Sequence, residues 1–594
     1  MLIGKRQDLR QPRGVRECAS SFDSWRAARA GTEQLRAVAD LLLEAVERSI
    51  KAGDGEAAAN FLQLAARALE AQSRWLASSR MEQAIQALAA TLPSASATQF
   101  QPVGVRRLHV LNRALPYGGH TAMAARWISS GEPGEIHDVV LLSQPGPVPD
   151  ILARAVADTG GQVSVLDPAS PILARAAELR GIVHAKAVTS VVLHVDTHDV
   201  IAALAFGVPG GPPVKTVNHA AHIFWAGGSC TDLVVNCRGS RLEAVWTSHH
   251  RGLKRYSIVP IPLVPPASDV AGAAERGRET MERARAELGL PAEAYIILTV
   301  GDTYKYQPAL GLDFTETCRR LLAARKDLVI LGVGVAPNVR WDGVARATGG
   351  RLRALGRQTD VARFHRAADL YIEGFPFGST TALLEAGLAR MPVVLAPGQC
   401  RPPFGTDGVA VDDTLRRPAD VAAYEREILR LVADPSAREE LANAFYCSVL
   451  RHHTGAGWRE HLRGAMAALP ATHNVQRRLQ PAETDVEDYG YWHTFRSAGH
   501  SPPERWLDDY LRLCSEAGER THIPRSLVEA CGANRKSRRG AAIPVPLLRL
   551  LCNGVMPVLP TPLARKVFVT IYDHLRPNSR SMRLLEWLLP PRFW

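Results

Sequence analysis

The chain has 594 residues, too many for a single hydrophobic core, and predicts roughly three to five structural units. Hydrophobic residues make up 46% and charged residues 22%, which are the proportions of an ordinary soluble globular protein. The net charge of +12 predicts a surface that attracts anions, but charge alone does not choose among nucleotide phosphates, anionic lipids and nucleic acids.

The nine cysteines are scattered and form no CxxC pair, so neither a zinc site nor a disulfide framework is expected. The first residues lack the apolar segment of a secretory signal, and no uninterrupted apolar run of about 18 residues is present. These features predict a cytoplasmic protein.

The N-terminal region, 1–100, is expected to be helical. Apolar residues recur at helical spacing between about 22 and 92, in a composition rich in Ala, Leu, Glu and Arg. The segment 92–102 predicts a linker. These helices are interpreted as a structural cap, with a protein-binding or dimerising surface as the alternative.

Short β-rich runs alternate with helical stretches from about residue 104, which is typical of βαβ units and a parallel sheet. Residues 101–265 are predicted to form the first such domain, and the Pro-rich segment 257–269 a hinge. The predicted strands lie in the runs VRRLHVLNRAL, IHDVVLLSQ, QVSVLDP, TSVVLHVD, KTVNHA and DLVVNC.

A second alternating set predicts another α/β domain over residues 266–470. Its strands are expected in the runs AYIILTVGD, DLVILGVG, RLRALG, DLYIEG and PVVLAP. The fold class is therefore α/β, with two Rossmann-like domains facing a cleft. Ligands of such sheets bind at the carboxyl ends of the strands. The remainder, 471–594, is expected to be a mostly helical C-terminal extension.

The stretch EGFPFGSTTALLEAGLARMPVV, Glu373–Val394, holds the most informative pattern. After a buried strand, Gly378 and the hydroxyls of Ser379, Thr380 and Thr381 lie where a helix begins. A helix N-terminus presents unpaired amides and partial positive charge, so these groups predict a cradle for a diphosphate. Glu385, one turn into the helix, is positioned for ribose hydroxyls. The alternative is that Ser379 or Thr380 only caps the helix.

This stretch resembles the donor-site segment of GT-B fold glycosyltransferases. The family-four pattern is matched at Glu373, Gly374, Phe375, Glu385, Ala386, Pro392, Val393 and Val394. The two glutamates are farther apart here than in that family, and the extra turn with paired threonines is similar to the O-GlcNAc transferase-like branch. The resemblance implies a nucleotide-sugar donor, with Glu373 facing the sugar.

Two further segments carry the resemblance on the donor side. Gly301 ends a predicted strand, and Lys305 matches the lysine that contacts the donor phosphates, although Asp302 replaces the family-four arginine. One lysine and a helix N-terminus can neutralise a leaving diphosphate without a metal, so no cofactor is expected. Gly356 lies where the base is expected to stack. The alternatives are a solvated surface lysine and an ordinary loop.

The first domain is expected to hold the acceptor and the catalytic histidine. Gly118, Gly119, His120 and Thr121 form a glycine turn at the first strand–helix junction. Histidines at later strand ends suit acceptor deprotonation or sugar recognition. The candidates are His194, Asp196, His219 and His222, with His219 or His222 nearest to the reacting carbon. A metal site is the alternative, but no helix-face histidine pair supports it.

The sequence thus predicts a metal-independent glycosyltransferase that acts on an unidentified glycan, lipid-linked sugar or protein, with its stereochemistry open. The alternatives are a nucleotide-sugar 2-epimerase on the same fold and a non-catalytic binding module. Nucleic acid, suggested by charge alone, is not expected as a partner. The basic run 534–540 before an apolar segment suggests contact with the inner face of a membrane, or else a capping subdomain.

Overall fold

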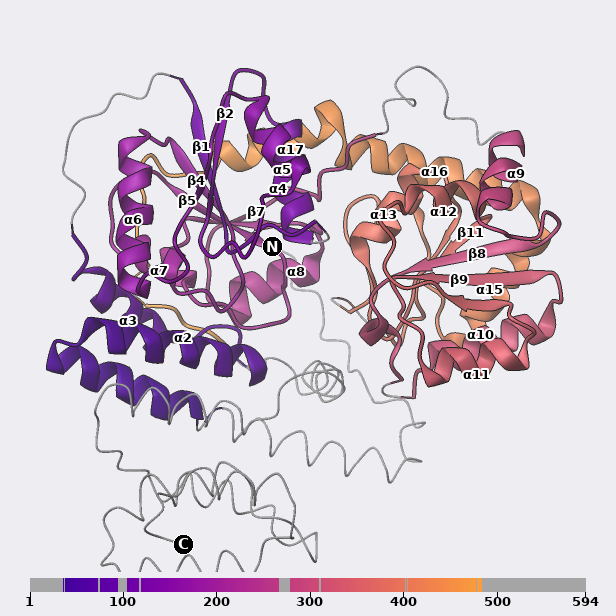
Figure 1. Cartoon of the computed structure of the whole chain (residues 1–594), viewed down its shortest axis with the longest axis horizontal. Helices are drawn as coiled ribbons and strands as arrows, with labels where there is room; N and C mark the ends of the chain where they lie inside the picture. The colour runs from indigo at the N-terminus through magenta and orange to yellow at the C-terminus, as the bar shows by residue number, and fades with distance from the viewer. Residues whose placement is uncertain are drawn as a thin grey trace, which may run out of the picture.

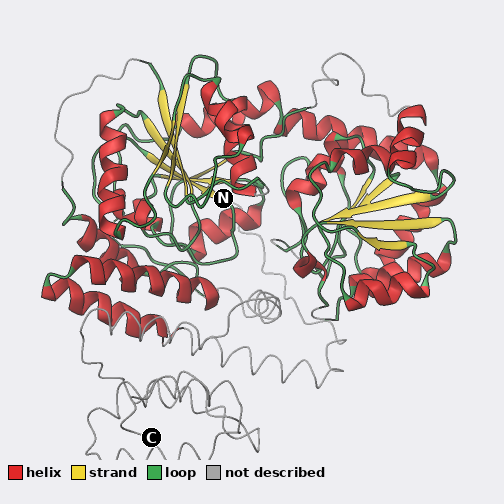
Figure 2. Ribbon diagram, viewed as in Figure 1, coloured by secondary structure: helices red, strands yellow, loops and turns green. Residues whose placement is uncertain are grey.

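A computed structural model describes residues 36, 38–72, 75–93, 104–116, 119–265, 278–308, 311–400, 402, 404–476 and 478–482. Figures 1 and 2 show two α/β domains side by side, each a parallel sheet with helices on both faces. The two Rossmann-like domains predicted from the sequence are confirmed. No helix in the described ranges is long and apolar enough to cross a bilayer.

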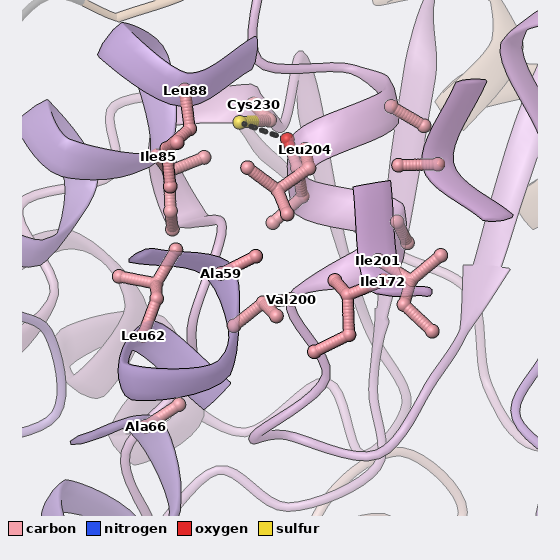
Figure 3. Close-up of a cluster of buried hydrophobic side chains, with 14 of the residues drawn as sticks. Ala59, Leu62, Ala66, Ile85, Leu88, Ile172, Val200, Ile201, Leu204 and Cys230 are labelled. Atoms are coloured by element: carbon pink, nitrogen blue, oxygen red, sulfur yellow. Dashed lines mark hydrogen bonds between the residues drawn. The ribbon is translucent and has the colours of Figure 1, made fainter. Parts of the chain in front are cut away.

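The N-terminal helices are built onto the first domain. They comprise residues 38–52, α2 (Gly55–Gln72) and α3 (Ser79–Ala89), whose first turn is capped by Ser78. Their apolar faces share one core with the first sheet and its helices, and Figure 3 shows Leu62 and Ile85 facing Val200 and Leu204. The expected cap is therefore part of the first domain's core.

Two carboxylates, the buried one of Glu82 and the half-buried one of Glu56, fix this helical layer. Glu82, on α3, accepts hydrogen bonds from the backbone amides of Gly227, Gly228 and Ser229 and from the hydroxyl of Ser229. Glu56 accepts the first two amides of a helix in the α/β domain, at Ile172 and Leu173. Because a carboxylate near a helix N-terminus is favourable, these contacts stabilise as well as orient the layer.

The first domain has a seven-stranded parallel sheet. Its strands, in spatial order, are β3 (Val163–Val165), β2 (Ile136–Leu141), β1 (Arg106–Leu111), β4 (Ser190–His194), β5 (Val214–Asn218), β6 (Leu233–Asn236) and β7 (Tyr256–Ile258). Its helical segments are α4 (Gly119–Ser130), α5 (Asp150–Ala157), α6 (Ile172–Ala185), α7 (Ile201–Ala205), η1 (Gly228–Cys230), α8 (Arg241–Val245) and η2 (Trp246–His250). The predicted hinge thus begins with a strand, β7, which pairs with β6.

The second domain has a five-stranded parallel sheet. Its strands, in spatial order, are β10 (Leu352–Ala354), β9 (Leu328–Val333), β8 (Tyr295–Val300), β11 (Leu370–Ile372) and β12 (Val393–Val394). Its helical segments are α9 (Arg278–Glu287), η4 (Thr303–Tyr306), α10 (Phe314–Ala324), α11 (Val339–Ala347), α12 (Ala362–Ala367), α13 (Thr380–Leu388), α14 (Val411–Thr414), α15 (Val421–Ala433) and α16 (Pro435–His453). Helix α11 buries a single side chain, Trp341, and so shows no apolar periodicity in the sequence.

After α16 the chain returns to the first domain. Helix α17 (Gly455–Ala467) buries Trp458 edge-on against Trp127 of α4, with ring centroids 5.6 Å apart. The following segment continues along this domain, where Nδ1 of His473 lies 2.6 Å from the Asp232 carboxylate. The domain limits drawn from the sequence stay predictions. The basic run 534–540 lies outside the described residues.

Candidate functional site

Helix α13 begins where the chain leaves β11 and passes through the loop 373–379. Ser379 is its N-cap residue, but its side chain does not bond to a helix amide. Its hydroxyl instead accepts a hydrogen bond from Nζ of Lys305 at 3.0 Å. The simple capping interpretation of Ser379 therefore does not describe this helix start, whose first amides lack intrahelical acceptors.

Lys305 lies in η4, directly after β8, and reaches the start of α13. Its Nζ also donates to the carbonyl of Gly378 at 2.9 Å and lies 5.2 Å from the ring centre of Phe377. Burial, together with the positive charge of Arg238, lowers the pKa of Lys305 to about 8, against the opposing influence of Glu373 and Asp302. Lys305 is thus a cation partly stripped of water and held at a helix mouth, not a solvated surface lysine.

Glycine is required at two positions around this contact. A Cβ on Gly301 would stand 2.9 Å from the Tyr306 hydroxyl and 3.0 Å from Oγ of Ser379, and one on Gly378 would meet Oε1 of Glu373 at 2.0 Å. The predicted Gly301, Lys305, Gly378 and Ser379 are therefore brought together. Real Cβ atoms do not approach other atoms so closely, so a side chain at either glycine would displace the loop.

The two threonines follow on the first turn of α13. Oγ1 of Thr380 lies 3.3 Å from Oγ1 of Thr406, which belongs to the loop after β12 and is fully buried. Thr380 and Thr381 are both half-buried. The hydroxyl of Ser379 thus lies beside Lys305, and the role of Thr380 and Thr381 at the start of α13 stays a prediction.

Glu373 has a different place from the one predicted. Its carboxylate is fully buried, with Oε2 accepting the amide of Ala396 at 2.8 Å and Oε1 that of Thr406 at 2.7 Å. A buried carboxylate is costly unless its oxygens are hydrogen-bonded, and here both are used within the fold. Glu373 therefore ties the loop 395–406 beneath α13 instead of facing a sugar.

Glu385 makes a contact between the domains. Its Oε1 forms an ion pair at 2.5 Å with the guanidinium of Arg126 on α4. The predicted ribose contact would have to replace this pair. Gly356 lies after β10, at φ 62°, and its amide donates to the carbonyl of Val335 at 2.7 Å, at the same sheet edge as Gly301.

The domains meet again beside Lys305. Arg238, which follows β6, donates to the Gly405 carbonyl at 3.3 Å and lies 3.4 Å from the Asp407 carboxylate. We call the contacts of Arg126 and Arg238 with the second domain the domain junction. These contacts bring two guanidinium groups of the first domain to the side of the second domain on which the N-terminus of α13 lies.

His222 of the first domain also contacts the second domain. Its ring lies 5.4 Å from that of Phe377 and 5.6 Å from that of Phe404, both in the second domain. The loop that carries it is held by Arg251, whose guanidinium donates to the carbonyls of Ala221 and Ile223 at 3.0 and 2.6 Å. The sequence prediction of a histidine near the donor domain thus has a geometric counterpart.

Most of the other predicted residues of the first domain contact one another. The rings of His120 and His219 stack with centroids 4.0 Å apart, and Nδ1 of His120 lies 3.9 Å from the Asp196 carboxylate. His194 is fully buried, and its Nδ1 lies 3.3 Å from Nε2 of His219. Gly119 is exposed at the start of α4, whereas Gly118 lies outside the described residues.

Thr121 does not point toward a ligand as predicted. It is almost fully buried, and its hydroxyl accepts the amide of Leu115 at 2.9 Å, which closes the turn before α4. Sequence reasoning also missed His109 and His137, which lie inside β1 and β2 and contact His194 through a chain of ring nitrogens. Their signal in the sequence was a histidine within the run of each predicted strand.

The histidines do not gather into a ligand shell. Over the part of the chain that the structure describes, no group of three or more His, Cys, Asp or Glu side chains is arranged to hold a metal ion.

Several solved structures resemble this chain at low identity. HepE of Anabaena, in complex with UDP, is 14% identical, covering 61% of this chain and 100% of its own, with a TM-score of 0.45. A glycosyltransferase from Rickettsia africae is 14% identical over 62% of this chain and 99% of its own, with a TM-score of 0.46. A mutant O-GlcNAc transferase of Thermobaculum terrenum is 16% identical over 84% and 88%, with a TM-score of 0.38.

No family model and no curated protein matches the chain. Identities and TM-scores this low do not identify the reaction.

Proposed function

We propose that the chain transfers a sugar from a nucleoside-diphosphate sugar to an unidentified acceptor. The observation that carries the proposal is the position of Lys305, whose Nζ lies 3.0 Å from Oγ of Ser379 at the N-terminus of α13. A departing nucleoside diphosphate gains negative charge as the sugar leaves. An ammonium group, hydroxyls and helix amides placed in advance stabilise that charge most effectively.

The charges at the N-terminus of α13 favour the binding of an anion. The pKa of Lys305 is lowered to about 8 by burial and by Arg238, so a positive charge there is partly disfavoured in the ligand-free protein. A bound diphosphate would supply the missing counter-charge and restore the ordinary pKa of the lysine. Such a site binds a diphosphate more strongly than a neutral sugar.

The proposal assigns the remaining residues by their places. Lys305, Ser379, Thr380 and Thr381 take the diphosphate, and Glu385 takes the ribose once Arg126 has released it. The acceptor approaches from the first domain, on the side of His219 and His222. The proposed transfer needs no metal, because Lys305 and the α13 amides can stabilise the negative charge of the leaving diphosphate.

A thermal-shift panel of nucleoside diphosphates and nucleotide sugars tests the proposal. A ligand present at about 100 times its dissociation constant stabilises the folded chain by about 2.7 kcal/mol. Lys305→Ala should weaken nucleotide binding about ten- to hundredfold, the value of a hydrogen bond to a charged group. Lys326→Ala, at an exposed position of the same domain, is the matched control and should bind like the wild type.

Two results would contradict this assignment. Binding that is equal in Lys305→Ala and wild type would place the nucleotide elsewhere, and a panel without any stabilising nucleotide would remove the donor. Incubation with the best-binding nucleotide sugar alone, followed by sugar analysis, separates transfer from epimerisation. Formation of the 2-epimer of the donor sugar would identify an epimerase, whereas release of the unchanged sugar would indicate transfer to water.

A further inference from the structure

Four imidazole rings form a continuous row across the first sheet. Nδ1 of His137 lies 2.9 Å from Nε2 of His109, whose Nδ1 lies 3.1 Å from Nε2 of His194. Nδ1 of His194 in turn lies 3.3 Å from Nε2 of His219. We call these four side chains the histidine row. Every link joins a δ nitrogen to an ε nitrogen, so all four rings run in the same direction.

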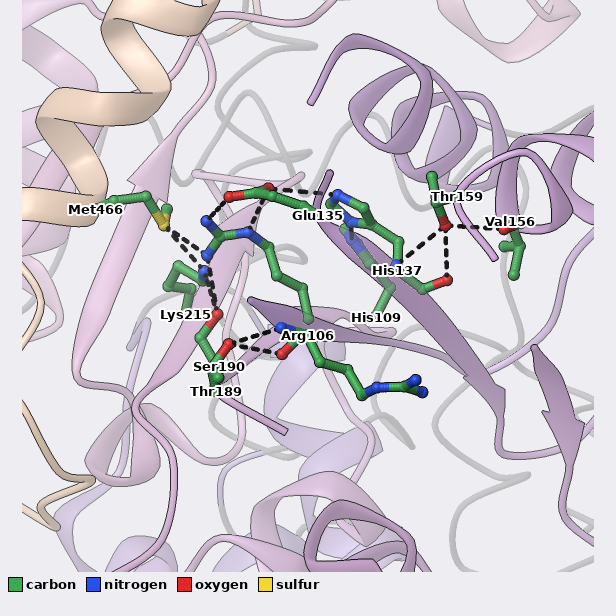
Figure 4. A network of polar contacts seen from close by, with 11 residues as sticks. Arg106, His109, Glu135, His137, Val156, Thr159, Thr189, Ser190, Lys215 and Met466 are labelled. Atoms are coloured by element: carbon green, nitrogen blue, oxygen red, sulfur yellow. Dashed lines mark hydrogen bonds and ion pairs between the residues drawn. The ribbon is translucent and has the colours of Figure 1, made fainter. Parts of the chain in front are cut away.

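The register of the sheet produces the row. His137, His109 and His194 belong to the neighbouring strands β2, β1 and β4, and His219 follows the end of β5. Arg107 pairs with His137 and Leu111 pairs with His194, so alternation along β1 puts Arg107 and His109 on the same face as both histidines. Part of the row appears in Figure 4, where His109 and His137 lie beside Glu135.

Helices α4 and α17 keep water from the row. Trp127 of α4 is fully buried, with its ring 6.2 Å from that of His109 and 5.9 Å from that of His194, edge-on in both cases. Met466 of α17 covers the adjoining side chains of Arg107 and Lys215, with its sulfur 3.1 and 3.3 Å from their nitrogens. Burial and the charge of Arg107 lower the pKa of Lys215 well below its ordinary value. The three interior histidines are therefore buried, as their exposure confirms.

The inner end of the row meets a carboxylate. Nε2 of His137 lies 3.4 Å from Oε2 of Glu135, and Nε of Arg107 donates to the same oxygen at 2.7 Å. Burial alone would raise the pKa of Glu135, but the hydrogen bonds from Arg107 and the nearby ring of His137 lower it to about 2. Glu135 is therefore ionised and acts only as an acceptor.

The outer end of the row is partly exposed. His219 and the ring of His120 stacked on it are both half-buried, at the carboxyl edge of the sheet. The bond of His219 to the row uses Nε2, and within the described ranges its Nδ1 makes no hydrogen bond. The row therefore runs from a buried ion pair to the carboxyl ends of the strands, where ligands of parallel sheets bind.

A neutral imidazole has one N–H and one bare nitrogen, so each link of the row needs one donor and one acceptor. Because Glu135 only accepts and its Oε2 lies 3.4 Å from Nε2 of His137, this ring is most stable with the hydrogen on Nε2 and with Nδ1 bare. The same choice then passes to His109, His194 and His219 in turn. Each ring carries its hydrogen on Nε2, and Nδ1 of His219 is left with a lone pair. The opposite direction would set a bare Nε2 against the carboxylate.

The charges around the row keep it neutral. Burial is the main cause that lowers the pKa of each of the four rings, to about 3 for His194. Lys215, on β5, adds to this at His109, His137 and His194, and Arg107 adds to it at His109 and His137. At His137 the adjacent Glu135 carboxylate acts in the opposite direction and raises the pKa. At the outer end His120 acts on His194 and His219, and the carboxylate of Asp196 faces His120. The neutral form is the one that can accept a proton.

We propose that the histidine row is a proton path oriented by Glu135, and that it presents Nδ1 of His219, not His222, as the proton acceptor for the incoming acceptor group. This inference rests on the proposed sugar transfer. The acceptor's O–H or N–H bond breaks, its proton moves to Nδ1 of His219, and its heavy atom bonds to the anomeric carbon. The bond from that carbon to the diphosphate breaks, and the electron pair leaves on the diphosphate.

The row then relocates the proton that His219 has taken up. His219 gives its Nε2 proton to Nδ1 of His194, and the same exchange at His109 and His137 moves the positive charge inward. The charge ends on His137, as an imidazolium beside the Glu135 carboxylate. His109, His194 and Glu135 are positioning residues in this scheme, and only His219 touches the acceptor.

The deciding measurement does not depend on sugar transfer. NMR of the full chain labelled with ¹⁵N-histidine, with rings assigned through single substitutions, reports which nitrogen of each ring carries hydrogen. We expect all four rings to be neutral at pH 7 with the hydrogen on Nε2. Mixed tautomers, or a hydrogen on Nδ1 of His219, would overturn the proposal even if the chain transfers sugar.

Variants test the direction of the path. Glu135→Gln presents a donor as well as an acceptor and should give mixed tautomers along the row. If that variant does not fold, His109→Phe cuts the row while keeping an aromatic ring, and His194 and His219 should then lose their single tautomer. His249→Gln, at an exposed histidine outside the row, is the control and should leave all four rings unchanged.

Kinetics separate this inference from the proposed function. With water as acceptor, hydrolysis of the best-binding nucleotide sugar should fall about a hundredfold or more in His219→Ala, the range of a general base. His109→Phe should shift the pH profile of kcat while leaving nucleotide affinity unchanged. Hydrolysis by the wild type with an unshifted profile in His109→Phe would overturn the path. No hydrolysis and no nucleotide binding by the wild type would instead refute the proposed function.

Discussion

The two α/β domains share a layout but place their charges differently. In the first domain ionisable side chains lie within the strands, as with Arg107, His109 and Lys215, which are all at least nine-tenths buried. In the second domain the central strands β8 and β9 bury apolar side chains, and Lys305 stands in the loop beyond the strand end. The charged side chains of the first domain thus lie inside its sheet, whereas Lys305 of the second domain lies beyond the carboxyl end of a strand.

The difference has an energetic consequence. A polar group inside a sheet is tolerable only when every hydrogen bond is made, so each member of the first domain's network depends on the others. A cation at a loop edge can be removed with little effect on folding. Substitution of Arg107 in the first domain should therefore change mainly stability, and substitution of Lys305 in the second mainly ligand affinity.

The largest effect is expected at Arg107. Arg107→Met removes the partner of Glu135 and leaves a buried carboxylate, which should lower the free energy of unfolding by about 3–5 kcal/mol. Adding Glu135→Leu removes the unpaired charge and should restore most of the loss. Urea unfolding followed by tryptophan fluorescence measures both variants, since Trp127 and Trp458 pack in the helices over this sheet face.

A matched change in the second domain sharpens the contrast. Arg319→Met breaks an exposed ion pair with Glu316 on α10 and should leave the unfolding transition unchanged. If Arg107→Met were no more destabilising than Arg319→Met, the interior network would contribute nothing to folding, and the distinction between the domains would fail.

The same contrast explains how much the sequence could predict. The second domain's strands are short apolar runs, and Lys305 and Ser379 lie just past two of them, so both strands and helix mouth were predictable from local pattern. The burial of Glu373 was not, because its partners, the amides of Ala396 and Thr406, come 23 and 33 residues later. The Arg126–Glu385 pair spans 259 residues and depends on how the domains meet.

The histidine row could not be predicted from the sequence, for a related reason. His194 and His219 were singled out at strand ends, but their connection to His109 and His137 requires the order and register of four strands. A one-residue shift in either pairing would turn a ring to the opposite face of the sheet. Local pattern gives the alternation of polar residues along one strand and not which strands become neighbours.

An intermediate effect is expected from pH, and it concerns the second domain only. The pKa of Lys305 is about 8 in the ligand-free protein and should rise when a diphosphate binds, so binding takes up a proton. Nucleotide affinity is then constant below about pH 8 and falls above it, by at most about tenfold per unit, until the pKa of the complex is reached. Isothermal titration of the best-binding nucleoside diphosphate from pH 7 to 10 measures this.

Lys305→Ala supplies the control for the pH series, because its affinity, already weak, should no longer change over that range. An equally steep fall in the variant would assign the proton uptake to another group and break the link between Lys305 and the diphosphate.

The smallest effect is expected where the two domains touch. Arg126 and Glu385 are about a fifth and a third exposed, and ion pairs of this kind contribute about 0–1 kcal/mol. If Glu385 has to leave Arg126 to bind ribose, Arg126→Ala removes that competition and should tighten nucleoside-diphosphate binding by up to about fivefold. Isothermal titration resolves such a change, and Arg154→Ala, which removes an exposed pair with Asp150, should leave affinity unchanged.

The sign of the Arg126 effect decides between two roles for the first domain. Tighter binding would mean that Arg126 only competes with ribose for Glu385 and that the first domain does not itself contact the donor. Weaker binding would mean that Arg126 itself meets the nucleotide, so that cations of the first domain reach the ligand of the second. Comparing the nucleoside monophosphate with the diphosphate then locates the contact, because a guanidinium on the terminal phosphate would favour only the diphosphate.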